Sequence, residues 1–266
     1  MSKIDQLFDQ LRRAGRKALM PFVTAGDPDL EFTAEVIRRL VAHGSSLCEL
    51  GIPYSDPIAD GPVIQASYTR SLAKRVKLAE ILDTLGRLTP ELAAPIVTMV
   101  SYAIVYRHGL GQYVADAKRA GVAGLIVPDL PAEEAGPLDE ICRREDVSLI
   151  QLITPITPRD RALRIAERTT GFIYYVSVTG ITGERTELPP EILRSVTWLR
   201  QQTPLPVCIG FGISRPDHVR MLSPVADGLI VGSAIVRRIA QAETRPREQV
   251  LDEIGDYVAE LLAAMQ

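Results

Sequence analysis

Three residues with carboxyl side chains lie close together in the stretch CELGIPYSDPIADGPVIQ, which runs from Cys48 to Gln65 and contains no Lys, Arg or His. They belong to Glu49, Asp56 and Asp60. Burial of a carboxylate without a cation raises its pKa, because the charged form loses its hydration. A group tuned in this way can both donate and accept a proton near neutral pH. The stretch therefore indicates acid–base chemistry by carboxyl groups.

Glu49 lies inside an apolar segment that has the pattern of a β-strand. Side chains alternate along a strand, so Leu47, Glu49 and Gly51 share one face. If this face points inward, the carboxyl group of Glu49 enters the interior. The alternative to an acid–base role is a structural one, in which Glu49 pairs with an arginine from elsewhere in the chain. Asp56 and Asp60 occupy the loop that follows, where Ser-Asp-Pro and Ala-Asp-Gly are also ordinary turn-forming sequences.

Short apolar segments rich in Val, Ile and Leu recur along the chain, each bounded by Gly, Pro or Asp, as β-strands are. Amphipathic helical patterns separate them, for example at residues 30–43, 132–145 and 158–168. Strands that alternate with helices predict βα units and a parallel sheet. The eight predicted strands are ALMPFVTA, SLCELGI, PIVTMVS, GLIVPDL, SLIQLIT, GFIYYVS, PVCIGFG and DGLIVGSA.

Eight βα units in 266 residues predict an α/β fold, a closed (β/α)₈ TIM barrel that forms a single domain over residues 1–266. An open doubly wound sheet is the alternative, but the first strand is followed by TAGDPD and not by a GxGxxG turn. Apolar residues at the spacing i, i+3, i+4, i+7 predict an extra N-terminal helix. Residues 242–266 have the pattern of a last helix.

Glycine-rich sequences follow the last three predicted strands. In TIM barrels the loops after strands seven and eight often bind a phosphate group at a helix N-terminus. Gly212, Gly232 and Ser233 are therefore candidate phosphate ligands, although tight turns also require glycine. The connection at 178–190 is long for a βα loop, and we expect it to be a lid over the site.

Several kinds of chemistry lack their residues in this chain. The predicted strand ends carry no lysine for a Schiff base and no histidine for a metal site, and the three cysteines form no CxxC pair. No metal or other cofactor is expected. The net charge of −3 and the absence of a long basic run argue against nucleic acid or a membrane surface as a partner. No apolar run approaches the roughly 18 residues of a membrane span, and a cytoplasmic location is expected.

The motifs ELGIPYSDPIADGPVIQ, PFVTAGDP, PDLP, TGITG, GFGIS and GSAIV occur here in the order seen in the tryptophan synthase alpha subunit family, which the chain resembles over about residues 5–240. The resemblance implies a (β/α)₈ barrel that splits indole-3-glycerol phosphate into indole and glyceraldehyde 3-phosphate, a retro-aldol reaction without a metal or Schiff base. It implies that Glu49 is the acid–base group and that Asp60 accepts a hydrogen bond from the indole N–H.

The resemblance also implies the remaining binding residues. The indole pocket is expected to consist of Phe22, Val100, Leu125, Ile153 and Tyr174, for which packing in the barrel core is the alternative. The phosphate group is expected at Gly183, Gly212, Gly232 and Ser233.

A pyridoxal-phosphate beta subunit is the partner that the resemblance implies, with Pro53, Asp56 and the segment after Tyr102 at the contact. Ile104 and Val105 stand where the family often has Asn and Pro. The alternatives are a lyase that acts alone and releases indole, a non-catalytic phosphate-binding barrel that activates a partner, and another phosphate-binding barrel isomerase.

Overall fold

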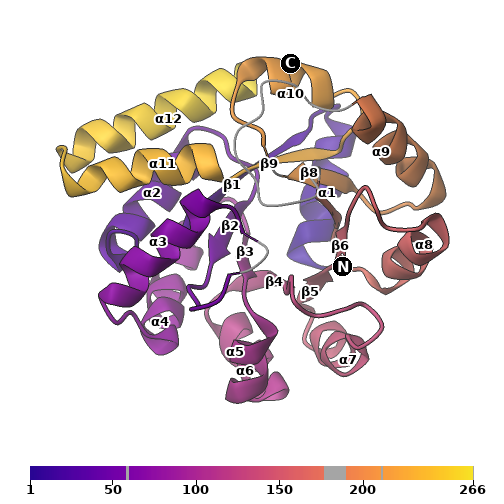
Figure 1. Cartoon of the computed structure of the whole chain (residues 1–266), viewed down its shortest axis with the longest axis horizontal. Helices are drawn as coiled ribbons and strands as arrows, with labels where there is room; N and C mark the ends of the chain where they lie inside the picture. The colour runs from indigo at the N-terminus through magenta and orange to yellow at the C-terminus, as the bar shows by residue number, and fades with distance from the viewer. Residues whose placement is uncertain (58–59, 177–189, 211, 266) are drawn as a thin grey trace.

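The computed structural model describes residues 1–57, 60–176, 190–210 and 212–265. Within these residues the strands form one parallel sheet, ordered β5-β4-β3-β2-β1-β9-β8-β7-β6, and helices surround it (Figure 1). The strands are β1 (Ala18–Thr24), β2 (Cys48–Gly51), β3 (Ile96–Met99), β4 (Val122–Ile126), β5 (Ser148–Ile150), β6 (Leu152–Ile153), β7 (Ile173–Val176), β8 (Val207–Gly210) and β9 (Gly228–Val231).

The two end strands of this sheet are the halves of one predicted strand. SLIQLIT is divided into β5 and β6 at Gln151, whose side chain is buried between them. β5 pairs with β4 and β6 pairs with β7, so the covalent link through Gln151 joins the two edges of the sheet. All eight predicted strands are therefore present, and the prediction of a (β/α)₈ TIM barrel is confirmed.

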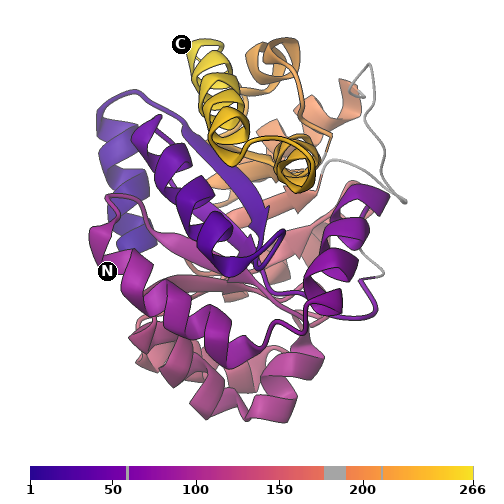
Figure 2. The ribbon, with the colours of Figure 1, turned by 90° about the vertical axis from the view of Figure 1, so that its left-hand side faces the viewer.

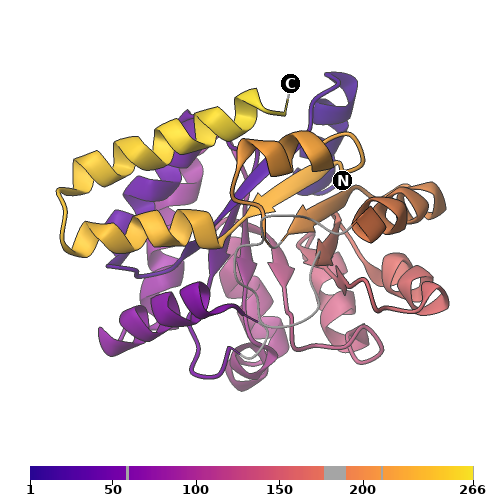
Figure 3. The ribbon, with the colours of Figure 1, turned by 45° about the horizontal axis from the view of Figure 1, so that its top comes forward.

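The helices cover the outside of the strands. In Figures 1 and 3, α11 and α12 lie side by side, and α12 also packs on α2. The helices are α1 (Lys3–Arg13), α2 (Leu30–Ala42), α3 (Pro62–Ala73), α4 (Leu78–Leu88), α5 (Tyr102–His108), α6 (Leu110–Arg119), α7 (Gly136–Arg144), α8 (Arg159–Arg168), α9 (Pro190–Gln202), α10 (Pro216–Leu222), α11 (Ser233–Ala240) and α12 (Arg247–Ala263), with 3₁₀ turns at Thr89–Glu91 and Gln241–Glu243.

Two predicted helices begin later than their patterns indicated. Residues 132–134 form a turn closed by the bond from Glu134 N–H to the Pro131 carbonyl, and α7 starts only at Gly136. Pro137 fits the first turn of α7, where no N–H is needed. The last helix starts at Arg247, directly after Pro246.

The predicted N-terminal helix is α1. The Ser2 hydroxyl accepts the Asp5 N–H and the Asp5 carboxylate accepts the Ser2 N–H, a capping box that satisfies two free donors. Ile4, Phe8 and Leu11 are the buried face of α1 and belong to the core cluster inside the barrel. Figure 2 shows the indigo α1 at the end of the barrel where the strands begin. α1 thus closes the amino-terminal end of the barrel, and the carboxyl end is left for a site.

The core has two layers. One apolar cluster fills the barrel interior, and a larger one lies between the strands and the helices. On β2, Leu47 belongs to the inner cluster, whereas Cys48 and Leu50 belong to the outer one. The alternation predicted for this strand is therefore confirmed, and Glu49 shares the inward parity of Leu47.

Candidate active site

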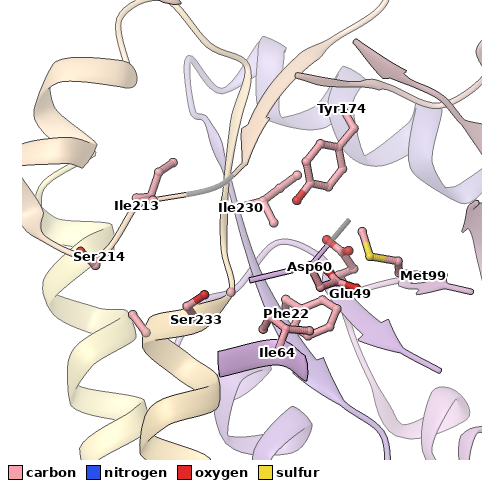
Figure 4. Close-up of a pocket in the computed structure, with 13 residues that line it drawn as sticks. Phe22, Glu49, Asp60, Ile64, Met99, Tyr174, Ile213, Ser214, Ile230 and Ser233 are labelled. Carbon is pink, nitrogen blue, oxygen red and sulfur yellow. The ribbon is translucent and has the colours of Figure 1, made fainter. Parts of the chain in front are cut away.

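A cavity opens at the carboxyl ends of the strands and encloses about 580 Å³ of empty space, open solvent at its mouth included. Figure 4 shows Glu49 and Asp60 next to each other, with Tyr174 and Phe22 on either side and Ser233 at the start of a helix. The described lining residues are Phe22, Glu49, Asp60, Ile64, Met99, Tyr174, Gly212, Ile213, Ser214, Ile230, Gly232, Ser233 and Ala234.

Glu49 is almost completely buried, with 2 % of its surface exposed. It stands in register with Phe22 of β1 and with Val97 of β3. Its Oε1 atom is buried and has no hydrogen-bond partner among the described residues. Burial, reinforced by the nearby charge of Asp60, raises the pKa of Glu49 to about 8. At neutral pH this carboxyl group is therefore mostly protonated and can act as an acid.

Asp60 lies in the loop between β2 and α3 and is also buried, with 6 % exposed. Gln65 Nε2 donates to the carbonyls of Asp60, at 2.8 Å, and Pro57, at 3.2 Å, and the Asp60 N–H also bonds to Pro57. These bonds hold the loop against the first turns of α3. Burial raises the pKa of Asp60 to about 6, so that this group is mostly ionised at neutral pH.

The two carboxyl groups thus differ in protonation although they line one cavity. None of the described lining residues is Lys, Arg or His. Environments that push the pKa values of two acids apart are typical of an acid and a charge-stabilising group that work together. The arrangement can protonate a ligand atom while it stabilises the positive charge that follows.

The far side of the cavity has the features of an anion site. Ser233 and Ala234 begin α11, where the first N–H groups of a helix have no intrahelical acceptor and attract negative charge. Gly212 and Ser214 line the same end. The φ of Gly212 is +78°, a left-handed conformation that favours glycine. The structure therefore places Gly212, Gly232 and Ser233 along the lining of one cavity.

Comparison with known proteins identifies the family. The family model described as tryptophan synthase alpha chain matches residues 8–265. A tryptophan synthase alpha chain from Rhodopirellula baltica is 54 % identical, with 100 % of this chain and 99 % of the relative covered. The crystal structure of tryptophan synthase subunit alpha from Legionella pneumophila superposes with a TM-score of 0.90 at 30 % identity, covering 100 % of this chain and 98 % of that chain.

The chain belongs to the tryptophan synthase alpha chain family. It is a carbon–carbon lyase of tryptophan biosynthesis that cleaves indole-3-glycerol phosphate. A second solved relative, from Pyrococcus furiosus, comes from a tryptophan synthase complex and is 36 % identical, with a TM-score of 0.85 over 92 % of this chain and 98 % of that chain.

Only part of the indole pocket predicted for this family member lines the cavity. Phe22 and Tyr174 do. The structure instead places Val100, Leu125 and Ile153 in the outer layer between strands and helices, and that part of the expected pocket is corrected. The physical reason is that parallel strands are apolar on both faces, so hydrophobicity does not reveal which side chains point inward.

Five apolar residues of the cavity were not predicted. They are Ile64 on α3, Met99 on β3, Ile213 after β8, Ile230 on β9 and Ala234 on α11. For Met99 a signal did exist: the residue is the register partner of Gly51, and Gly51 shares the inward face of Glu49. Recognising it requires the strand register, which the sequence does not contain.

α3 is anchored to the loop after β1. Arg70 donates two hydrogen bonds, of 2.8 and 2.7 Å, to the fully buried Asp27, and the Ser71 hydroxyl donates to the Ala25 carbonyl. The Thr24 and Ser67 hydroxyls are 2.6 Å apart. A bidentate pair of this kind fixes orientation as well as distance. The anchor holds the helix that carries Ile64 and, through Gln65, the Asp60 loop.

The residues expected at the partner contact differ in exposure. Asp56 is exposed and accepts a 2.6 Å hydrogen bond from the Ser55 hydroxyl, whereas Pro53 is buried. Gly183 and the expected lid over 178–190 lie almost entirely outside the described residues, apart from position 190.

Among the residues that the structure describes, no three His, Cys, Asp or Glu side chains gather where a metal ion could bind. None of the described helices combines the length and the apolar character that crossing a membrane requires.

Proposed function

We propose that Glu49 and Asp60 carry out the retro-aldol cleavage of indole-3-glycerol phosphate to indole and glyceraldehyde 3-phosphate. The observation that carries this assignment is the pair of buried carboxyl groups in one cavity, with no cation among the described lining residues. A nearby cation would keep Glu49 ionised and would neutralise the charge of Asp60.

The reaction begins with transfer of the Glu49 proton to carbon C3 of the indole ring. The ring then carries a positive charge that is shared with its nitrogen. The Asp60 carboxylate accepts the hydrogen bond of the ring N–H and stabilises this charge, as fixed charges do best in a dry site.

Cleavage follows from this protonated state. The Glu49 carboxylate accepts the proton of the hydroxyl group on the carbon attached to C3. That oxygen forms the aldehyde C=O, the bond to C3 breaks, and its electron pair returns to the ring. Glu49 ends protonated, as it began, and no proton or electron is left over.

The shape of the cavity suits the two halves of the substrate. Phe22, Tyr174 and Met99 supply apolar walls beside the carboxyl groups. The start of α11, with Gly212, Gly232 and Ser233, is proposed to bind the phosphate, and Gly183 is proposed to join it from outside the described residues. With the indole ring between the apolar walls and the phosphate at the start of α11, carbon C3 of the ring lies near Glu49.

We further propose that the protein is one domain, works in the cytoplasm, and pairs with a pyridoxal-phosphate beta chain that consumes the indole. The relative in the Pyrococcus furiosus tryptophan synthase complex supports this pairing. On this chain the exposed Asp56 and the segment after Tyr102 are proposed to lie at the contact; Pro53, being buried, is proposed to shape the loop beneath it.

The direct test is to purify the chain and measure indole release from indole-3-glycerol phosphate, with and without a tryptophan synthase beta chain. We expect slow release by the chain alone and a large acceleration by the partner. Equal rates would mean that the lyase works independently and would overturn the pairing. No indole release under either condition would overturn the catalytic assignment.

A further inference from the structure

A tyrosine of α3 lies next to the cavity and has a buried hydroxyl group. Tyr68 lies on α3, is 1 % exposed, and packs its ring 5.5 Å from that of Tyr54. Its hydroxyl oxygen has no hydrogen-bond partner among the described residues. Buried polar groups are nearly always paired in folded proteins, so an exception requires an explanation.

The hydroxyl group of Tyr68 lies close to Gly51, at the carboxyl end of β2. A Cβ atom added to Gly51 would lie 2.7 Å from this oxygen and 2.4 Å from Cζ of Phe22. Gly51 follows Glu49 by two residues on the same inward face of β2. Glycine at position 51 therefore makes the space through which the Tyr68 hydroxyl approaches the strand that carries Glu49.

Glu49 presents the matching unpaired atom. Its Oε1 is buried without a partner among the described residues, as the Tyr68 hydroxyl is. The ionisable groups that face the two are Asp60 from the loop, Tyr54, and Tyr174 from β7. Burial, followed by the influence of Asp60, Tyr54 and Glu49, holds the pKa of Tyr68 well above its usual range, so the phenol keeps its proton and can only donate to a carboxylate.

We propose that Tyr68 is a positioning residue whose hydroxyl group donates a hydrogen bond to the Glu49 carboxylate formed when Glu49 gives up its proton. This inference rests on the proposed role of Glu49. Before the reaction Glu49 is neutral and the bond is not required; catalytic hydrogen bonds often tighten only when the charge develops. The bond stabilises the carboxylate in the dry cavity and directs it toward the hydroxyl group whose proton it must accept next.

The test is Tyr68→Phe, which removes one oxygen atom and keeps the ring. We expect kcat to fall about 10-fold with KM unchanged, since a hydrogen bond to a charged group is lost in the reaction and not in binding. A lost donor to the ionised form raises the pKa of Glu49. The alkaline limb of the kcat/KM profile should therefore move up by about one pH unit.

Tyr113→Phe is the matched control. Tyr113 is also fully buried, and its hydroxyl group interacts with Thr98. The residue lies in the outer layer, away from the cavity. This variant should leave kcat, KM and both limbs of the pH profile unchanged.

Two results would overturn the inference. In one, Tyr68→Phe shifts the acidic limb and leaves the alkaline limb in place, which would assign the hydroxyl group to Asp60. In the other, neither limb moves. Glu49→Gln, assayed alongside, separates the inference from the proposed function: an active Glu49→Gln enzyme overturns both, whereas an inactive one with an unchanged Tyr68→Phe profile overturns the positioning role alone.

Discussion

Phe22 of β1 stands in register with Glu49 of β2, so an aromatic ring and a buried carboxyl group lie side by side at one level of the barrel interior. The ring removes water from the carboxyl group on that side, and Gly51, two residues along, leaves room for the tip of the ring. The raised pKa of Glu49 follows from this packing.

The first prediction concerns the two carboxyl groups themselves. Glu49→Gln and Asp60→Asn should each lower kcat at least 10²-fold, because general acid–base groups typically contribute about 10²–10⁴-fold. Binding of inorganic phosphate, measured by calorimetry, should be unchanged in both variants. Cleavage at the wild-type rate by Asp60→Asn would remove Asp60 from the mechanism.

The pH dependence of kcat/KM follows from the two pKa values. Cleavage requires ionised Asp60, which is lost as pH falls through about 6, and protonated Glu49, which is lost as pH rises through about 8. We expect a bell-shaped profile between these limits. The phosphate of the substrate also ionises near pH 6, so the alkaline limb is the diagnostic one; its absence would contradict the role of Glu49 as acid.

Glu49 should also make the protein less stable as the pH rises. Folding raises the pKa of Glu49 from 4.5 to about 8. The stability that protonated Glu49 contributes to the fold is therefore fully present below about pH 4.5 and is lost as pH rises to about 8. Glu49→Gln cannot ionise. The melting temperature of this variant should match that of the wild type near pH 4.5 and exceed it near pH 8. The difference near pH 8 should correspond to roughly 1–4 kcal/mol in the free energy of unfolding. An equal difference at both pH values would contradict the burial of an ionisable group.

Gly51→Ala tests the packing beside Glu49. The added methyl group would lie 2.4 Å from Phe22 Cζ and 2.7 Å from the Tyr68 hydroxyl, so both side chains must move. We expect a loss of about 1–3 kcal/mol in unfolding free energy, together with lower activity. Gly111→Ala is the control: it lies in α6 with no atom within 4 Å of the new methyl group, and it should stabilise the protein by up to about 1 kcal/mol.

Ser233→Asp tests the anion site. A carboxylate at the start of α11 is favourable for the helix, so the melting temperature should be kept or raised. It would repel the substrate phosphate, and we expect KM to rise at least about 10-fold, whereas Ser233→Ala should change KM less. If KM is the same for all three proteins, the phosphate binds elsewhere.

The pattern of elements could be predicted from the sequence because it depends on local properties. Apolar runs between Gly and Pro, and amphipathic stretches between those runs, mark the strands and helices wherever the rest of the chain lies. The inward parity of Glu49 could also be predicted, since a single acid in an apolar strand distinguishes its two faces. The starts of α7 and α12 could not, because Pro131 and Pro246 direct turns that the helical spacing does not reveal.

Residue type alone predicted acid–base chemistry by carboxyl groups in the stretch that holds Glu49 and Asp60, and the glycine-rich sequences predicted an anion site at Gly212 and Gly232; the individual roles of Glu49 and Asp60 came from the resemblance to the family. The tertiary structure decided which apolar residues surround them. Val100, Leu125 and Ile153 are as hydrophobic as Met99, Ile64 and Ile230, and only strand register and helix docking turn the second group inward. It also decided the two pKa values, because a carboxyl group is charged or neutral according to the side chains that exclude water from it, and those come from distant parts of the chain.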